Sequence, residues 1–142
     1  MDTRKLETES AMLEEQYLVR VQIPTNDVSR VLEAIINVCP LRYGNYEQVA
    51  FRYNAGTQQF KSLEASKLGE TDLTYVPCDE ISFTVPKSDR TITAVIEAIF
   101  ESHPYEEPVI LIQEVMRTRF KYGQTKDNPN KWWNRPESES PW

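Results

Sequence analysis

The segment from His103 to Pro108, HPYEEP, carries the residue types in this chain that are best suited to chemistry. His103 is the single histidine among 142 residues, and Glu106 and Glu107 follow it closely. Imidazole and carboxylate groups bind metal ions and transfer protons, so these three residues form a candidate metal or acid–base site. One histidine with two neighbouring carboxylates is a small donor set, and a purely structural corner explains the same residues.

A proline at each end makes this segment rigid. Proline fixes its own φ and restricts the residue before it, so we expect the preceding helix to end at Ser102 or His103. Pro108 is expected to begin a strand at a position where no ladder donor is needed. We favour a structural corner in which the His103 ring bonds backbone or carboxylate groups, and the alternative is a presented binding surface.

The segments on both sides of this corner have clear periodicities. Ser88 and Asp89 are cap candidates for a helix, and residues 109–116 are typical of a buried strand that closes a sheet. The apolar residues expected to face inward on the helix are Ile92, Val95, Ile96, Ile99 and Phe100.

An internal repeat predicts the wider architecture. VQIPTND followed by RVLEAIINVCP is echoed by FTVPKSD followed by TAVIEAIFESHP. The first copy predicts a strand at 17–23 and a helix with an apolar stripe over 28–36, ending at Cys39-Pro40. Two copies of strand, helix and strand give the order β-α-β-β-α-β, and right-handed crossovers place both helices on one face of an antiparallel sheet. The sequence therefore predicts an α+β fold, the ferredoxin-like plait.

The region between the two copies predicts an extended second-strand hairpin. Residues 49–53 alternate with period two, and the Asn54-Ala55-Gly56 sequence indicates a turn. We expect 57–63 to return antiparallel, 64–78 to form a loop, and 81–85 to form the next strand.

Composition and motifs exclude several functional classes. A net charge of −6 and a pI near 4.9 argue against non-specific nucleic-acid binding, which needs clustered Lys and Arg. The chain shows neither a membrane-span-length apolar run nor a signal-peptide core, so we expect a cytoplasmic protein without membrane contact. Cys39 and Cys78 lack metal or redox spacing, and no P-loop or nucleophile motif is present. We therefore assign no catalytic residue, no cofactor, and no metal ligand apart from the candidate His103.

The distribution of charge and apolar residues divides the chain into three parts. These are a flexible N-terminal arm at 1–16, a folded domain at 17–116 and a basic, aromatic tail at 117–142. Arg and Lys alternate with aromatic residues in the tail, a pattern that also occurs in proteins that stack on nucleic-acid bases. We instead expect Trp132 and Trp133 to pack on this subunit or on a neighbour, because exposed tryptophans are costly in water.

Four motifs in a fixed order resemble a known family. GNY at 44–46, GTQQFK at 56–61, LGE at 68–70 and HPYEEP at 103–108 look like the inserted domain of the Nif-three-like (NGG-interacting-factor) family. That insert resembles the PII and CutA proteins, which are ferredoxin-like and commonly trimeric. The resemblance covers about 17–116 and implies a PII-like fold and a homo-oligomer, with a trimer favoured. The two-metal site of the family's enclosing domain uses several histidines, so its hydrolase activity is not carried over to a chain with one.

The resemblance also implies a candidate ligand site. Its matched residues would line a pocket with the corner, with Lys61 contacting an anion. The alternative is that the aromatic residues simply fill the sheet edge. We predict a non-enzymatic, oligomeric regulatory or assembly module that binds a small ligand or a protein partner, and the alternative is a metal-binding protein or enzyme using His103 and Glu106/Glu107. The predicted ligand-binding residues are Tyr46, Thr57, Phe60, Lys61, His103, Tyr105, Glu106 and Glu107.

Overall fold

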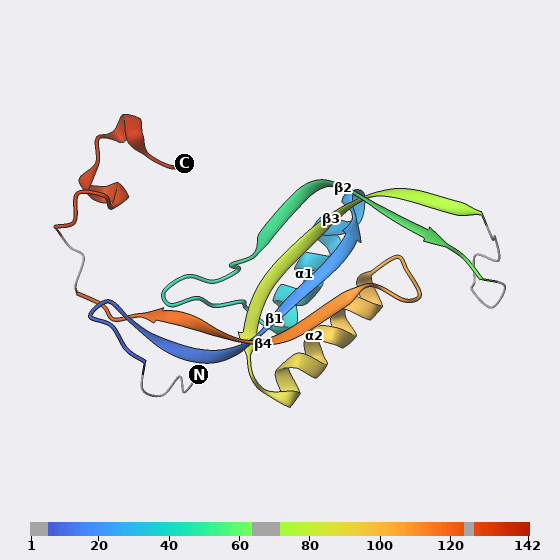
Figure 1. Ribbon diagram of the computed structural model, residues 1–142, viewed down its shortest axis with the longest axis horizontal. Helices are drawn as coiled ribbons and strands as arrows, with labels where there is room; N and C mark the ends of the chain where they lie inside the picture. The colour runs from blue at the N-terminus through green and yellow to red at the C-terminus, as the bar shows by residue number, and fades with distance from the viewer. Residues whose placement is uncertain (1–5, 64–71, 124–126) are drawn as a thin grey trace. The chain divides into compact units, whose positions relative to one another are not determined.

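The computed structural model describes residues 6–63, 72–123 and 127–142 and has the predicted order of elements (Figure 1). The strands are β1 (Ala11–Pro24), β2 (Phe51–Lys61), β3 (Leu73–Pro86) and β4 (Ile110–Phe120). The helices are α1 (Val28–Val38) and α2 (Asp89–Ser102), with short 3-10 helices η2 (Thr25–Asp27), η3 (Trp132–Asn134) and η4 (Glu137–Glu139). None of the helices described is long and apolar enough to span a membrane.

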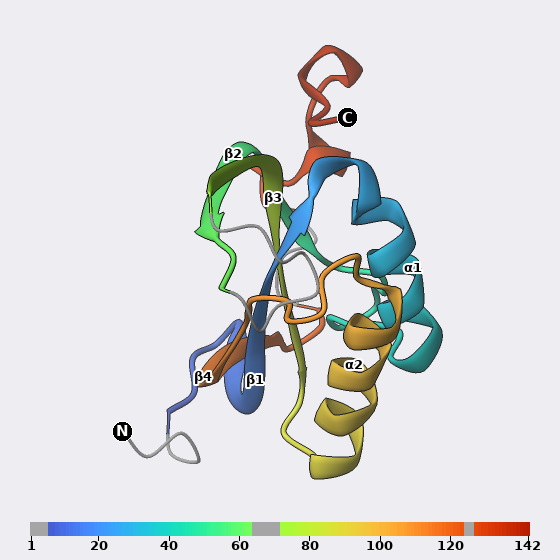
Figure 2. The ribbon, with the colours of Figure 1, turned by 90° about the vertical axis from the view of Figure 1, so that its right-hand side faces the viewer.

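The four strands form one sheet in the order β2-β3-β1-β4. β3 runs antiparallel to both β1 and β2, with Val19 of β1 opposite Phe83 of β3. At the other edge, the Gln22 N–H donates to the Val109 carbonyl oxygen at 3.1 Å, which joins β1 to the start of β4. Both helices lie on the same face of the sheet (Figure 2). This arrangement confirms the predicted α+β ferredoxin-like plait.

The core lies between the helices and the sheet face that they cover. Alternate residues of β1 and β3 point into it, as the period-two pattern predicts. One predicted inward residue is an exception: Phe100 is 45% exposed, because it lies one helical step of about 100° beyond the buried Ile99. The fully buried strand and helix residues are Val19, Val21, Ile23, Ile81, Val85, Val31, Ile35, Val95 and Ile99.

The ends of α2 follow the predicted signals. The Thr91 N–H donates to the Ser88 hydroxyl oxygen at 3.3 Å, so Ser88 caps the first turn. The helix ends at Ser102, and the His103 N–H still donates to the Ile99 carbonyl oxygen at 2.9 Å. Pro104 then prevents the helix from continuing.

The turn predicted at Asn54-Ala55-Gly56 is wrong, because β2 continues through these residues as a bulge. Tyr53 pairs with Glu80 and Gly56 pairs with Cys78, so two residues of β2 oppose one of β3. Ala55 has a φ of 64°, and a Cβ added to Gly56 would stand 2.6 Å from the Cys78 carbonyl oxygen. Residues that favour turns therefore produce a bulge here, because Gly56 lets the strands pair closely beside it.

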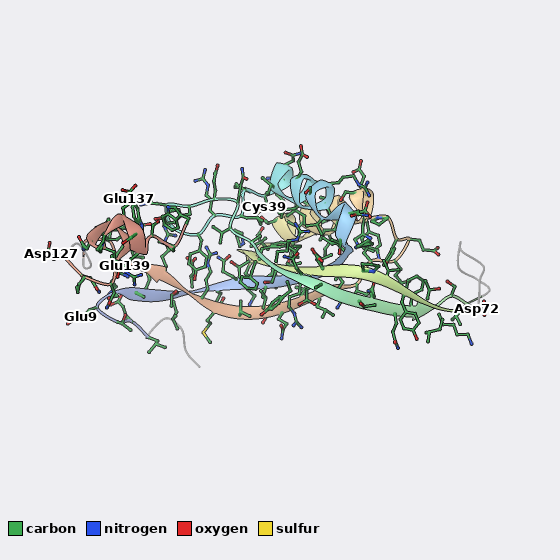
Figure 3. All side chains as sticks on the ribbon, turned by 90° about the horizontal axis from the view of Figure 1, so that it is seen from above. Glu9, Cys39, Asp72, Asp127, Glu137 and Glu139 are labelled. Atoms are coloured by element: carbon green, nitrogen blue, oxygen red, sulfur yellow. The ribbon has the colours of Figure 1, made fainter. Side chains whose placement is uncertain are left out.

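The second-strand hairpin consequently forms between β2 and β3. Their pairing extends from Gly56 opposite Cys78 to Lys61 opposite Leu73. Residues 73–78, expected in a loop, are thus part of a strand, and 64–71 of that loop lie outside the described residues. We call the paired segments 56–61 and 73–78 the arm, and Asp72, labelled in Figure 3, lies at its far end, just before 73.

β4 is an edge strand and is less buried than its apolar sequence predicts. Val109, Leu111 and Ile112 remain between 37% and 42% exposed. Ile110 packs against the core, so Leu111 points to the sheet face that no helix covers. The apolar residues at 109–112 therefore lie on both faces of the strand, and the helices cover only one of these faces.

β1 and β4 are longer than predicted, and the chain divides into two compact units. β1 begins at Ala11 rather than 17, and β4 ends at Phe120 rather than 116. Glu15–Val115 form one unit, and the two chain ends, up to Glu14 and from Met116, form the other. Within the second unit, Arg117 Nε donates to Glu14 at 2.7 Å and the Lys121 ammonium donates to the Thr8 carbonyl oxygen at 3.0 Å. Basic residues of the tail thus contact the N-terminal arm.

The tryptophans of the tail pack against one another. Trp132 meets Trp133 at 5.9 Å and Trp142 at 5.2 Å between ring centroids, in edge-to-face arrangements. Asn128 organises this segment, since its carbonyl oxygen accepts from the Asn134 side-chain amide at 2.7 Å. Packing of these rings on a neighbouring subunit stays a prediction.

Candidate ligand-binding site

The predicted site residues do not all lie together. Tyr46 is in the connection between α1 and β2, where Tyr43 and Tyr46 exchange backbone hydrogen bonds of 2.8 and 3.1 Å. Figure 1 shows this connection at the opposite end of the sheet from the α2–β4 corner that contains His103. Tyr46 is therefore separated from His103.

The remaining predicted residues lie on the arm and on the corner. Thr57, Phe60 and Lys61 follow the bulge in β2, with the Lys61 side chain exposed. Glu106 and Glu107 are exposed on the corner, whereas His103 is 6% exposed. The structure brings Phe60 together with the buried half of the corner.

His103 uses both ring nitrogens to bond the backbone. Nε2 lies 2.8 Å from the Gln22 carbonyl oxygen, and Nδ1 accepts from the Tyr105 N–H at 3.0 Å. A neutral ring with its proton on Nε2 satisfies both bonds, because that nitrogen donates while Nδ1 accepts. The ring therefore joins the end of α2 to β1, which is the arrangement expected of a structural corner. Neither nitrogen is left for a metal ion in this geometry.

Burial lowers the pKa of His103 from its usual value near 6.5. The bond to Gln22 and the charge of Asp27 oppose this change, and Arg30 adds to it. The unfolded chain then binds more protons than the folded chain just below pH 6.5. His103 accordingly contributes stability that is fully present above pH 6.5 and decreases as pH falls towards the folded-state pKa.

Replacing His103 with alanine is expected to lower the free energy of unfolding by about 1–3 kcal/mol, because the Gln22 carbonyl and the Tyr105 N–H lose their partner. Urea denaturation at pH 7 measures this. The Glu107→Ala variant changes an exposed residue of the same corner and should stay within about 0.5 kcal/mol. Wild type should also lose stability between pH 7 and pH 5 relative to His103→Ala. Equal stability of the two proteins at pH 7 would rule out the structural role.

Tyr105 connects the corner to the arm. Its ring lies 4.9 Å from the His103 ring and 5.8 Å from the Phe60 ring, between centroids. Burial, followed by the neighbouring Cys78, raises the pKa of the Tyr105 hydroxyl. That hydroxyl is buried and has no hydrogen-bond partner among the described residues. Phe60 and Tyr105 therefore fill the space between arm and corner, in line with the structural alternative for these aromatic residues.

A small hollow lies beside the bulge, with a volume of about 210 Å³. Three strands contribute to it, and Thr57 is the residue that it shares with the predicted site. Its size is below the ~300–1,000 Å³ that is typical of sites for drug-sized ligands. The residues around it are Gln22 of β1, Tyr53, Asn54, Gly56, Thr57 and Gln58 of β2, and Cys78, Asp79 and Glu80 of β3.

A chain of hydrogen bonds orients the amides of this hollow. The Gln58 Nε2 donates to Gln22 Oε1 at 2.9 Å, and the Gln22 Nε2 donates to Glu80 Oε2 at 3.3 Å. The Gln22 carbonyl oxygen is the group that His103 holds. The corner thus fixes the backbone of a residue whose side chain lines the hollow. His103 is a positioning residue here.

Cys78 lines the hollow as a protonated thiol. It is 6% exposed, and its Sγ lies 4.0 Å from Gln58 Oε1. Burial, with the charge of Asp79 next in effect, raises the pKa of the thiol. A thiol with a raised pKa carries little thiolate at neutral pH and is a poor nucleophile.

Asp79 holds the bulge in place. Its side chain is fully buried, yet it accepts from Arg52 Nε at 2.7 Å and from the Thr25 hydroxyl at 2.9 Å. Burial on its own would raise the pKa of this carboxyl. The bonds from Arg52, Thr25 and the Ala55 backbone, together with the Arg52 charge, outweigh that effect and lower the pKa. The ionised carboxylate thus links η2 to Arg52, just before the bulge, and to the Ala55 backbone within it.

Of the residues that line the hollow, the sequence predicted only Thr57 as a site residue. The burial of Asp79 was predictable from the sequence. This residue continues the alternation by which Ile81, Phe83 and Val85 point into the core. A charged residue at such a position indicates a buried ion pair. Gln22, Gln58 and Glu80 gave no comparable signal, since polar residues on the open face of a strand are usual.

The described residues contain no group of three or more His, Cys, Asp or Glu side chains placed to hold a metal ion. Cys39 and Cys78 are both buried and both have free thiols. The LGE motif at 68–70 lies outside the described residues.

Comparison with known proteins gives matches to solved structures. No protein-family model matches the chain, and no curated protein matches it. A Bacillus cereus protein related to NIF3 is 26% identical with a TM-score of 0.60, over 78% of this chain. The chain spans 27% of the length of that protein.

Two smaller proteins match over most of their length. CutA from Xylella fastidiosa is 11% identical with a TM-score of 0.52, over 70% of this chain and 83% of that one. CPII, a nitrogen regulatory PII-like protein from Thiomonas intermedia K12 that was solved with ADP, AMP and bicarbonate, is 10% identical with a TM-score of 0.50. That match covers 75% of this chain and 97% of CPII. These matches confirm the resemblance to a PII-like and CutA-like domain related to NIF3.

Proposed function

We propose that this PII-like, CutA-like domain is a non-enzymatic homo-oligomeric module, with a regulatory or assembly role, that binds a small ligand or a protein partner. The observation that carries the proposal is the apolar surface on the sheet face without helices. Figure 3 shows both helices on one side of the sheet and none on the other.

The sheet face without helices, which we call the open face, carries large apolar side chains on both edge strands, β2 and β4. Phe51 and Tyr53 of β2 pair with Ser82 and Glu80, which alternate with buried residues and therefore point away from the helices. The two aromatic rings touch, at 4.8 Å between centroids, and are 58% and 61% exposed. Leu111 of β4 points to the same face. Contact with a second copy of the chain would remove these side chains from water.

The resemblance to PII and CutA proteins, which are commonly trimeric, supports three copies. Two open sheet edges, β2 and β4, also favour assembly, because natural proteins tend to pair or cover such edges. The bonded ring nitrogens of His103 and the protonated Cys78 support a binding role rather than catalysis.

Light scattering of the full chain is expected to give three times the 16.6 kDa mass of one chain. Replacing Phe51 with aspartate places a charge on the open face and should shift the mass to that of the monomer. Tyr46→Asp makes a comparable change at an exposed aromatic residue of the α1–β2 connection, outside the strands, and should leave the mass unchanged. A wild-type monomer at millimolar concentration would refute the assembly.

A further inference from the structure

The contact between the corner and the arm depends on one ring nitrogen of His103. The arm extends beyond the end of β1, whose last residue pairs with Cys78, and it passes beside the corner (Figure 1). Phe60 of the arm meets Tyr105 of the corner through their rings. The backbone of Tyr105 is held in turn by His103, because its N–H donates to Nδ1 at 3.0 Å. The position of the outer arm, around Phe60, therefore depends on whether Nδ1 can accept a hydrogen bond.

The two ring nitrogens of His103 respond differently to a proton. Nε2 donates to the Gln22 carbonyl oxygen in the neutral ring, and it still donates in the charged ring. Nδ1 accepts from the Tyr105 N–H in the neutral ring only, because the charged ring carries a proton on both nitrogens. Two donors would then face each other across 3.0 Å. Protonation thus keeps the ring bonded to β1 and breaks its bond to Tyr105.

The side chain of Tyr105 is poorly anchored once that bond is broken. Its hydroxyl is buried and has no hydrogen-bond partner in the part of the chain that the structure describes. A buried hydroxyl without a partner gains hydrogen bonds when it reaches water. The ring contacts with His103 and Phe60 hold the side chain in, and hydration of the hydroxyl opposes them. The closed position of Tyr105 therefore depends on the backbone bond to neutral His103.

The charged and titratable groups around the ring come from several elements. Asp27 of η2 favours the charged ring and Arg30 of α1 opposes it, and the two form an ion pair of 2.7 Å. Burial has the largest effect and lowers the pKa of His103. The pKa values of Tyr105 and of its neighbour Cys78 are raised, so both groups stay uncharged below pH 7. The corner itself adds two exposed carboxylates, Glu106 and Glu107. The ring is thus neutral at pH 7 and gains its charge below pH 6.5.

We infer that His103 is a pH-sensitive switch that controls the contact between the corner and the arm. In the neutral state, Nδ1 holds Tyr105 against Phe60. Protonation of Nδ1 releases Tyr105 and frees the outer arm. The inner arm stays bound to β1, because the Gln58 amide still donates to Gln22 at 2.9 Å. All of these contacts lie within one chain, so the inference goes beyond the proposed binding role and does not depend on the assembly.

An NMR titration of the full-length ¹⁵N-labelled chain from pH 7.5 to pH 5 tests the switch. The backbone amides of Phe60, Thr74 and Tyr105 are expected to shift together with the His103 ring, with one midpoint below pH 6.5. The Gln58 amide should shift clearly less, because its side chain remains bonded to β1. Equal shifts at Gln58 and Phe60 would overturn the inference, as would amides of Tyr105 and Phe60 that do not follow the ring.

Two replacements of His103 separate the roles of its nitrogens. Asparagine places an oxygen near the position of Nδ1 and does not titrate, so His103→Asn should keep the arm closed and abolish the transition. Glutamine places its NH₂ near the position of Nε2 and offers no acceptor near Nδ1. His103→Gln should therefore show at pH 7 the Phe60 shifts that wild type shows at pH 5. A transition that persists in His103→Asn, or wild-type Phe60 shifts in His103→Gln at pH 7, would refute the switch.

Tyr105→Phe tests the same switch with His103 intact. Loss of the unpartnered hydroxyl favours the closed position, so the midpoint should move to lower pH. Glu107→Gln removes an exposed carboxylate of the corner and should leave the midpoint unchanged. An unchanged midpoint in Tyr105→Phe, or an equal displacement in Glu107→Gln, would contradict the inference.

Discussion

Replacing Ile99 with alanine lowers the free energy of unfolding by about 2–5 kcal/mol if the two helices share one core with the sheet. Ile99 is fully buried, in a cluster that also contains Ile35 of α1 and Val85 of β3. Removing three carbon atoms at this position leaves a cavity that close-packed neighbours fill only partly. Urea denaturation of wild type and variant measures the loss.

Phe100→Ala is the matched control for this prediction. Phe100 is the adjacent helix residue and is 45% exposed, so its truncation should cost clearly less than that of Ile99 despite the larger side chain. The repeat relates Ile35 to Ile99, and Ile35→Ala should cost a similar amount to Ile99→Ala. A loss below about 0.5 kcal/mol at both isoleucines would refute the paired-helix plait.

Replacing Arg52 with methionine is expected to lower stability by about 3 kcal/mol at pH 7. The value is at the low end of the ~3–5 kcal/mol for breaking a buried ion pair, because Thr25 and Ala55 still donate to Asp79. The two charged residues of this ion pair differ in their access to water. Arg52 is 42% exposed and reaches water, whereas Asp79 is fully buried and depends on its partners.

A double replacement and a pH series separate the charge from the packing. Arg52→Met with Asp79→Leu removes both charges and should recover most of the loss. In wild type the pKa of Asp79 is lowered, so its stabilising contribution is present above the usual carboxyl pKa near 3.9 and is lost as pH falls below it. Without Arg52, burial raises that pKa, and protonation at low pH relieves the buried charge. The cost of Arg52→Met should therefore be smaller at pH 4 than at pH 7, and a cost independent of pH would contradict this account.

The fold followed from patterns that act locally and repeat. Two proline-bounded copies of strand and helix specify the order of elements, and the alternation of Val19, Val21 and Ile23 specifies which face of β1 is buried. The corner was also predictable, because Pro104 ends α2 and leaves His103 to bond the backbone. In each case the residues that carry the signal are close in sequence.

The bulge and the hollow depend on contacts that are distant in sequence. Asn54-Ala55-Gly56 has the composition of a turn, and its conformation is decided by Asp79, 24 residues beyond Ala55, and by the approach of the Cys78 carbonyl to Gly56. The exposure of Phe100 and Leu111 reflects which faces the neighbouring elements cover. Sequence periodicity indicates that the two faces of a helix or strand differ in polarity. It does not indicate which neighbouring element covers each face.

Native mass spectrometry of the full chain over a range of concentrations tests the central claim, which is an oligomeric binding module assembled through its open sheet face. We expect a dominant species at three times 16.6 kDa for wild type and the single-chain mass for Phe51→Asp. A wild-type spectrum that contains the 16.6 kDa species at every concentration, and no larger one, would contradict it.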